Sequence, residues 1–261
     1  MRGTDRGVSD MIAFVIVFSL IITSVGITYT FGYSTLSDYQ EDEQKRNAER
    51  AFVALSNNVG EIESGQIEAR AGELRLAGGR LSVEDDTQIT VSSPSWSLSN
   101  GTEARLSNQT ARSFVYEFEG TKVEYENGAV FRQDGDGRHI MLAEPEYRCG
   151  DSYASVSIVQ FLPNDGALSS DGTVQVLAEQ ENAVLLYPAN RTGTNDATVD
   201  HVTVTVQSDK AEAWEEYFDD TGWTVVDGSG QERTFKCEPD GGSNQIDVYV
   251  RKTRISIDYF A

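Results

Sequence analysis

The chain is poor in histidine and cysteine, and this limits the catalytic and metal-binding sites that it can form. It contains two histidines, His139 and His201, and two cysteines, Cys149 and Cys237, in 261 residues. Neither histidine has a partner motif and no G-x-S-x-G turn presents a serine nucleophile, so we expect no catalytic site and no enzymatic activity. The cysteines lack C-x-x-C spacing and a nearby histidine, so we also expect no metal and no cofactor.

Positive charge is scarce as well. The sequence has 42 acidic residues against 21 basic ones, which gives a formal net charge of -21, and only five of the basic residues are lysines. Binding to phosphates requires clusters of Lys and Arg, so a nucleic-acid partner is disfavoured. Scattered carboxylates with few lysines resemble the surfaces of proteins from salt-loving archaea, where salt screens the self-repulsion of such a charge.

Repeats with a period of 20 to 50 residues, proline tracts and low-complexity segments are also absent, so the sequence does not support a repeat architecture. Hydrophobic residues make up 39% of the chain, which is enough for a folded core. The remainder after the N-terminal region, about 200 residues, fits a single domain.

Residues 11–37 form the one long stretch without a charged side chain. Its first part, residues 11–31, is mostly apolar, and a helix of that length spans about 30 Å, the hydrocarbon thickness of a bilayer. A secretory signal would have a shorter apolar region and a cleavage site of the A-x-A kind, and residues 24–37 contain no alanine. We therefore predict an anchor that spans the lipid bilayer, with a buried core helix as the alternative.

Small residues recur along the predicted anchor. Ser19, Thr23, Gly26 and Thr30 follow one another at spacings of four, three and four, which places them on one face of a helix. Such faces let helices approach closely in lipid, so we predict that this stripe packs against another helix. The alternative is that the hydroxyl groups bond only to carbonyls of their own helix.

Helical spacing continues beyond the apolar stretch. Apolar residues between Ala48 and Ile62 recur every three or four positions, with polar residues between them. One helix is therefore expected from about residue 8 to residue 62, and a bend costs least at Gly32.

From Gly65 onward the apolar period changes to two, which predicts β-strands. The pair Gly78-Gly79 predicts a hairpin, and the pair Asn127-Gly128 between alternating segments predicts a second one. Further strands are expected at residues 114–118, 156–162, 174–177, 183–186, 202–206, 234–238, 246–250 and 255–259.

The predicted fold class is α+β, with a long N-terminal transmembrane helix that extends into an antiparallel, mostly β extracellular domain. Residues 210–218 are the exception within that domain, because their aromatic residues have helical spacing. We predict a short helix that packs this aromatic face onto a sheet, and an exposed aromatic binding patch is the alternative.

Several acidic segments have carboxylates close together, as cation-binding sites do. Asp134-Gly135-Asp136-Gly137 begins like a calcium loop, but Arg138 stands at the fifth position and Pro145 at the twelfth, where further ligands are needed. We therefore predict a glycine-rich turn there. Residues 84–86 and 219–220 have the composition to gather cations, and solvated loops explain them equally well.

Two features favour an external location for the C-terminal domain. Asn100, Asn108 and Asn190 are in glycosylation sequons, and the even cysteine number allows a disulfide between Cys149 and Cys237, with two free thiols as the alternative. Basic residues flank the anchor on both sides, so charge alone does not fix its orientation.

The N-terminus has Arg6-Gly7, then Val8-Ser9-Asp10, then the apolar run. This order of residues resembles the class III signal of archaeal type IV pilins. Residues 125–132 and the closing aromatic strands are also similar to haloarchaeal pilin-like membrane proteins. The acidic residue here is third after the expected cut, and Ile12 stands where bacterial pilins have glutamate. Together with the chain length, this favours a minor pilin or a pilin-like surface protein over a main filament subunit.

The resemblance implies that a prepilin peptidase cuts between Gly7 and Val8. It divides the chain into a leader, residues 1–7, a transmembrane and continuing amphipathic helix, residues 8–62, and a β-rich extracellular domain, residues 63–261. It implies a single-pass protein of the cell membrane with a cytoplasmic N-terminus, and other pilin-like subunits as partners. An uncleaved, membrane-anchored surface binding domain outside any filament is the alternative.

Overall fold

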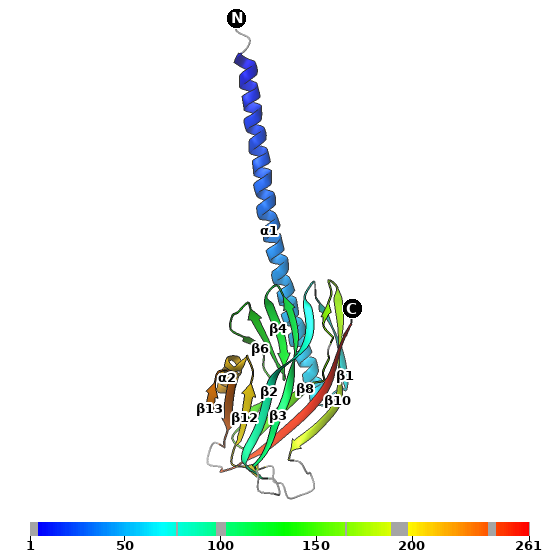
Figure 1. The fold of residues 1–261 in the computed structure, drawn as a ribbon, viewed down its shortest axis with the longest axis vertical. Coiled ribbons are helices and arrows are strands. Elements are labelled where there is room, and N and C mark those ends of the chain that lie inside the picture. The colour runs from blue at the N-terminus through cyan, green and yellow to red at the C-terminus, as the bar shows by residue number, and fades with distance from the viewer. Residues whose placement is uncertain are drawn as a thin grey trace. The chain divides into compact units, whose positions relative to one another are not determined.

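The computed structural model describes residues 5–76, 78–97, 103–164, 166–188, 198–239 and 244–260. The chain forms two compact units, Met1–Arg46 and Asn47–Ala261. The first contains the N-terminal part of a long helix, and the second contains the end of that helix together with a mostly antiparallel β domain (Figure 1). The predicted fold class of a long N-terminal apolar helix followed by a mostly β domain is therefore confirmed.

Helix α1 spans Asp5–Glu63 and continues through Gly32. It ends where the chain adopts a left-handed conformation at Gly65, with φ of 77°. The amide of Gln66 donates to the carbonyl of Glu61, and the amide of Gly65 donates to the carbonyl of Ile62, both at 3.0 Å. These bonds satisfy carbonyls that the helix end leaves open, which is why a glycine stands at this position.

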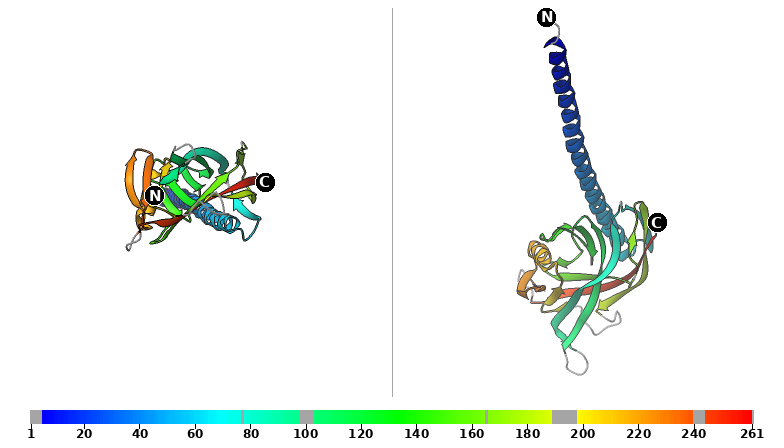
Figure 2. Two further views of the ribbon diagram at one scale, coloured as in Figure 1. Left: turned by 90° about the horizontal axis from the view of Figure 1, so that it is seen from below. Right: turned by 45° about the horizontal axis from the view of Figure 1, so that its top comes forward.

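The strands form two sheets, and the long curved strands of both are visible from two sides in Figure 2. In the described part of the chain the first sheet has the order β1-β10-β15-β8-β7, with β11 paired to β15. The second has the order β13-β14-β12-β2-β3-β4-β5-β6, with β9 paired to β2. Strands β15 and β8 are paired in parallel, and the other pairs are antiparallel.

The strand bounds of the first sheet are β1 Ala69–Arg75, β7 Arg148–Cys149, β8 Tyr153–Phe161, β10 Thr173–Tyr187, β11 Thr198–Val199 and β15 Ile246–Phe260. Those of the second sheet are β2 Arg80–Ser97, β3 Glu103–Phe118, β4 Thr121–Glu126, β5 Ala129–Asp134, β6 Ile140–Ala143, β9 Leu168–Ser169, β12 Val202–Gln207, β13 Thr224–Ser229 and β14 Glu232–Cys237.

The predicted hairpin at Gly78-Gly79 is wrong. Strand β1 pairs with β10 in the first sheet, whereas β2 pairs with β3 in the second, so the chain changes sheets at this turn. Gly78 has the expected positive φ, 99°. A side chain at Gly79 would overlap the ring of Tyr116, so the glycine there allows a close approach to a strand of the second sheet.

The hairpin at Asn127-Gly128 is confirmed, since both residues have positive φ and connect β4 to β5. The predicted helix is also confirmed: α2 spans Ala211–Asp220 and buries Trp214, among other aromatic residues, in the core. The alternative of an exposed aromatic patch is therefore wrong for this helix.

Strand β4 is buried on both faces. Val123 and Tyr125 belong to a core cluster that also contains residues of α1 and both sheets. On the opposite face, Glu124 and Glu126 are buried beneath the start of α2. Acidic residues are therefore buried in a strand that is covered on both sides, an arrangement that requires compensation.

Candidate functional site

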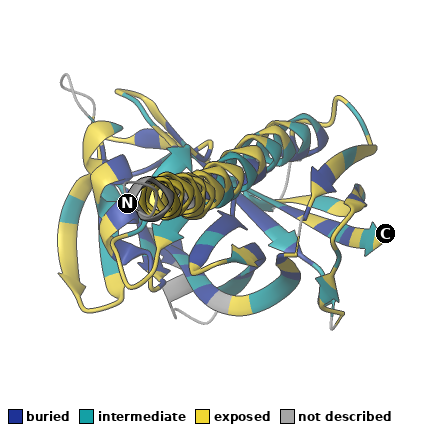
Figure 3. Ribbon diagram, turned by 90° about the horizontal axis from the view of Figure 1, so that it is seen from above, coloured by how far each residue is buried: buried dark blue, intermediate teal, exposed yellow. Residues whose placement is uncertain are grey.

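The described residues 10–33 of α1 expose all their side chains, and most of these are apolar (Figure 3). Phe14, Phe18 and Leu20, for example, are 54–68% exposed. Aromatic residues also stack along the helix, with ring centroids of Phe14 and Phe18 5.9 Å apart. Helix α1 is long and apolar enough to cross a membrane, and the buried-helix alternative does not hold for this segment.

The stripe of small residues lies on this exposed segment. The Thr30 hydroxyl donates to the Gly26 carbonyl at 2.9 Å, as the own-helix alternative expects. Thr35 donates in the same way to the carbonyl of Phe31. A Cβ added at Gly26 would meet no atom within 4 Å. The hydroxyl bonding and the free space at Gly26 are compatible with helix packing, which stays a prediction.

The residues of the expected processing site lie at the start of α1. Arg6, Gly7 and Val8 are in its first turns, and Asp10 is exposed. The side chains of the first three fall outside the described residues. The cut between Gly7 and Val8 therefore stays a prediction.

The last part of α1 is a core element of the β domain. Ala48, Phe52, Val59 and Ile62 are at most 1% exposed, and Phe52 stacks on Phe114 with centroids 5.4 Å apart. Polar contacts accompany this packing: Glu49 pairs with Arg132 at 2.5 Å, and the Ser56 hydroxyl donates to the Gly128 carbonyl at 2.7 Å. The helix end is therefore held by both apolar burial and hydrogen bonds.

An acidic cavity of about 330 Å³ lies beside this helix end. Glu61, Glu63, Glu144 and Glu146 line it, together with Tyr125. Glu63 is only 9% exposed, and burial raises the pKa of its carboxyl group to about 7. The negative charge of Glu146 raises this pKa further, and the nearby positive charge of Arg251 opposes the shift.

We expect Glu63 to make the protein less stable as the pH rises from about 4.5 to about 7. The folded state keeps the proton that the unfolded state has already lost, so this stabilisation is complete below pH 4.5 and is lost as the pH passes 7. The shift corresponds to about 3 kcal/mol of unfolding free energy. Glu63→Gln should remove this loss, and denaturant unfolding of both proteins from pH 4 to pH 8 measures it.

The matched control for this prediction is Glu61→Gln, on the same helix turn. Glu61 is 41% exposed and pairs with Arg70 at 2.7 Å, a surface ion pair of small energetic weight. If the unfolding free energies of wild type and Glu63→Gln changed with pH in the same way, the prediction would be contradicted.

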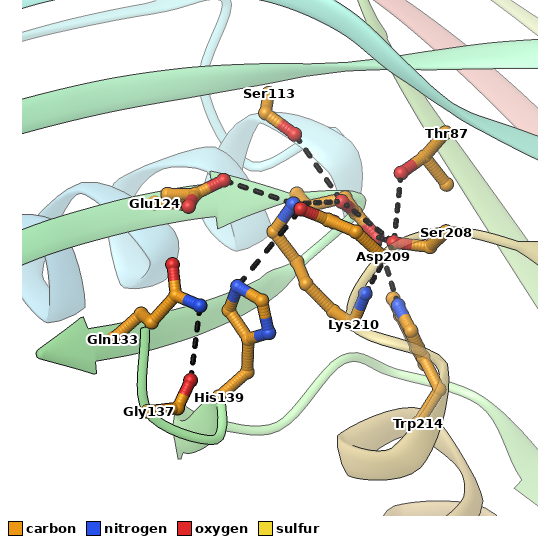
Figure 4. A network of polar contacts seen from close by, with 11 residues as sticks. Thr87, Ser113, Glu124, Gln133, Gly137, His139, Ser208, Asp209, Lys210 and Trp214 are labelled. Atoms are coloured by element: carbon orange, nitrogen blue, oxygen red, sulfur yellow. Dashed lines mark hydrogen bonds and ion pairs between the residues drawn. The ribbon is translucent and has the colours of Figure 1, made fainter. Parts of the chain in front are cut away.

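A second polar centre lies between β4 and the start of α2 (Figure 4). The Nζ atom of Lys210 is 2.9 Å from Glu124, 3.2 Å from Glu126 and 2.7 Å from Asp209. The side chains of Lys210 and Glu126 are fully buried, and that of Glu124 is 4% exposed, whereas that of Asp209 is 47% exposed. One cation therefore contacts two buried carboxylates and one half-exposed carboxylate.

Neutral donors complete this cluster. The indole Nε1 of Trp214 donates to Glu126 at 2.8 Å, and the hydroxyls of Ser113 and Ser208 also donate to that carboxylate. Ser208 in turn accepts from Thr87 at 3.1 Å. Buried carboxylates need such donors because they have lost their water.

The outer side of this cluster borders a cavity of about 500 Å³. His139 lies there, with Nε2 4.0 Å from Asp209. Burial raises the pKa of Asp209, but the charge and hydrogen bond of Lys210 and the nearby His139 outweigh it, so the pKa lies below its ordinary value. His201 is elsewhere, before β12, and its carbonyl accepts from Ser93. The two histidines are thus not brought together.

Cys149 and Cys237 form a disulfide, with Cα atoms 5.7 Å apart. Cys149 ends β7 in the first sheet, and Cys237 ends β14 in the second. The bond therefore joins the two sheets, and the free-thiol alternative does not hold.

The remaining predicted residues are dispersed. The amide of Gly137 donates to the Asp134 carbonyl at 3.0 Å, which confirms the glycine-rich turn. The loop alternative is wrong for residues 84–86 and 219–220, because the first segment belongs to β2 and the second ends α2. Asn100 and Asn190 lie outside the described residues, and Asn108 is in β3, where its side chain is not described.

The chain matches the model of one protein family, described as a family of unknown function, over residues 6–258. No curated protein and no solved structure matches it. The match includes nearly all of α1 and the β domain. The chain therefore belongs to the family of unknown function DUF7289.

Proposed function

We propose that the protein is a pilin-like, single-pass membrane protein that acts in assembly or adhesion as a minor pilin or filament-associated subunit. Its N-terminal helix lies in the cell membrane until it packs against other subunits of the same kind. The protein has a structural role in this proposal and no enzymatic one.

The proposal rests on the difference in burial between the two ends of α1. Residues 10–33 expose apolar side chains, whereas residues 48–62 of the same helix contribute to the core of the β domain. An exposed apolar helix surface of this length needs lipid or other helices around it. The resemblance of residues 6–10 to a class III signal favours a helix that is first inserted in lipid and then assembled.

The proposed orientation has a cytoplasmic N-terminus and an extracellular β domain. The disulfide between Cys149 and Cys237 supports it, because disulfides persist in oxidising compartments. A cytoplasmic start is also where a prepilin peptidase would meet Gly7. The acidic net charge of -21 suits a domain that stays in solution rather than on anionic lipid headgroups.

The first experiment is the intact mass and N-terminal peptide of the protein extracted from membranes of a salt-loving archaeal host. A mature start at Val8 supports processing and filament assembly. A retained Met1 or Arg2 would overturn the processing step and leave an uncleaved anchor with a surface binding domain.

Gly7→Leu is expected to abolish processing while leaving membrane insertion intact, because the peptidase must accept the residue before the cut. Immunoblots of membrane fractions would then show only the unprocessed form, and filament incorporation would be lost. Gly3→Leu is the matched control in the same leader and should be processed normally. Normal processing of Gly7→Leu would rule out the assigned cut.

Gly26→Leu is expected to weaken subunit association by about 1 kcal/mol, roughly five-fold, because the side chain would separate closely packed helices. The added Cβ meets no atom of its own chain within 4 Å, so the effect should appear only in assembly. Cross-linking yield in membranes measures it. Gly32→Leu is equally free of internal contacts but lies off the stripe. Equal yields for both variants would favour the own-helix alternative.

A further inference from the structure

The cluster around Lys210 is not used by the proposed function, and its composition is unusual. Lys210 and Glu126 are fully buried, Glu124 is nearly so, and all three are in direct contact. Burying charged groups is costly even when they are paired, and converting two of them into a neutral group removes that cost.

We propose that the Nζ atom of Lys210 and the side-chain carboxyl group of Glu124 condense to an isopeptide bond, with Glu126 relaying the protons. This bond would link strand β4 covalently to the start of α2. It is a self-modification, so it requires no enzyme and no cofactor.

The reacting groups are already close. The Nζ atom of Lys210 is 2.9 Å from Oε2 of Glu124, which places the carboxyl carbon one bond further on. Groups held in such geometry react far faster than free groups in water, because the entropy of bringing them together has been lost on folding. Trp214 donates to Glu126, and Phe131 stands opposite Glu124 in the neighbouring strand β5. Their aromatic rings, with centroids 5.6 Å apart, lower the polarity around the cluster.

Glu126 is placed to move protons rather than to react. It contacts Nζ at 3.2 Å, and donors from Trp214 and Ser208 hold its carboxylate in place. Asp209 is closer to Nζ, at 2.7 Å against 2.9 Å for Glu124, but it is adjacent to Lys210 in the chain and half exposed, so it stays a hydrated carboxylate. Glu124 combines the short distance with burial, and this selects it as the acyl partner.

The reaction balances without an added reagent. One proton passes from the Lys210 ammonium through Glu126 to the Glu124 carboxylate, giving an amine and a carboxylic acid. The amine nitrogen then attacks the carboxyl carbon, and its second proton passes through Glu126 to the departing oxygen. The carbon–oxygen bond breaks, one water leaves, and the third hydrogen stays as the amide N–H. The cavity that Lys210 and Asp209 line gives this water a way out.

The test is the mass of the full-length protein, purified in detergent and measured after denaturation and reduction of its disulfide. We expect the wild type to be lighter by one water than its processed sequence. Trypsin should fail to cut after Lys210 and should release a branched peptide that contains residues 123–132. Fragmentation between Glu124 and Glu126 then identifies the bonded residue.

Three variants make the result specific. Lys210→Arg should have the full mass, and Lys236→Arg, which changes a surface lysine, should keep the deficit. Glu124→Gln keeps a reactive carbonyl and should release ammonia to give the wild-type product. Glu126→Gln should reduce the bonded fraction at least about ten-fold, the usual lower range for loss of a proton-transfer group.

A wild-type protein of full mass that trypsin cuts after Lys210 would overturn the proposal, whatever the variants do, and would leave the cluster as an ion pair. A bond found on Glu126 would overturn the assignment of Glu124. An unchanged bonded fraction in Glu126→Gln would overturn the relay.

Discussion

Lys210→Met is expected to lower the free energy of unfolding by about 3–5 kcal/mol, because the carboxylates of Glu124 and Glu126 stay buried in the variant with neither a cation beside them nor a bond to residue 210. Glu124 and Glu126 are at most 4% exposed, so water cannot replace the lost partner. Methionine keeps most of the volume, so the loss does not come from a cavity. Denaturant unfolding at pH 7 measures the difference from wild type.

Lys236→Met is the matched control for this prediction. Lys236 pairs with Glu238 at 2.6 Å, but the two side chains are 26% and 53% exposed, so the change should cost less than about 1 kcal/mol. In the Lys210→Met background, Glu124→Gln should recover part of the stability, since it removes one of the two uncompensated charges. Equal losses for the two methionine variants would contradict the account of the cluster.

Local sequence patterns predicted the elements whose packing follows from their own periodicity. The charge-free run and the apolar spacing up to Ile62 indicated α1, and the Asn127-Gly128 pair indicated the β4–β5 turn. The aromatic spacing at Trp214 and Phe218 indicated α2. In each case the residues that form the element also carry its signal.

Strands β10 and β15 were each predicted as two shorter strands, because polar residues interrupt their apolar pattern. In β15 the side chains of Val248 and Val250 enter one core cluster, whereas those of Ile255 and Ile257 enter the other. The polar residues between them lie where the strand passes from one cluster to the next. Whether one strand contributes to two core clusters depends on elements that are distant in the sequence. The local pattern of residues therefore could not predict that β15 is continuous.

The Lys210 cluster was missed for a related reason. In β4 the acidic residues Glu124 and Glu126 alternate with Val123 and Tyr125, which is the usual pattern of a strand with one solvent-exposed face. Here α2 covers that face. This coverage follows from the order of the strands in the sheet, which the sequence of β4 alone does not contain. The one sequence signal was the rarity of lysine, which made a lysine beside an aromatic helix worth attention.

Replacing both cysteines by serine is expected to cost about 4 kcal/mol of unfolding free energy. Cys149 and Cys237 are separated by 88 residues, and a bond that closes a loop of this length removes much of the freedom of the unfolded chain. The bond also connects β7, a strand of only two residues, to the second sheet, so its loss should release the β7 edge first. Thermal and denaturant unfolding measure the overall loss, and hydrogen exchange around Cys149 measures the local one.

A reductant provides the control for the cysteine variant. It should bring the wild type down to the stability of the double serine variant and should leave the variant unchanged, because only the wild type has a bond to break. If the double variant matched the oxidised wild type, the connection between the sheets would contribute no stability. The two sheets would then be held by their shared core alone, in which Cys237 packs with residues of both.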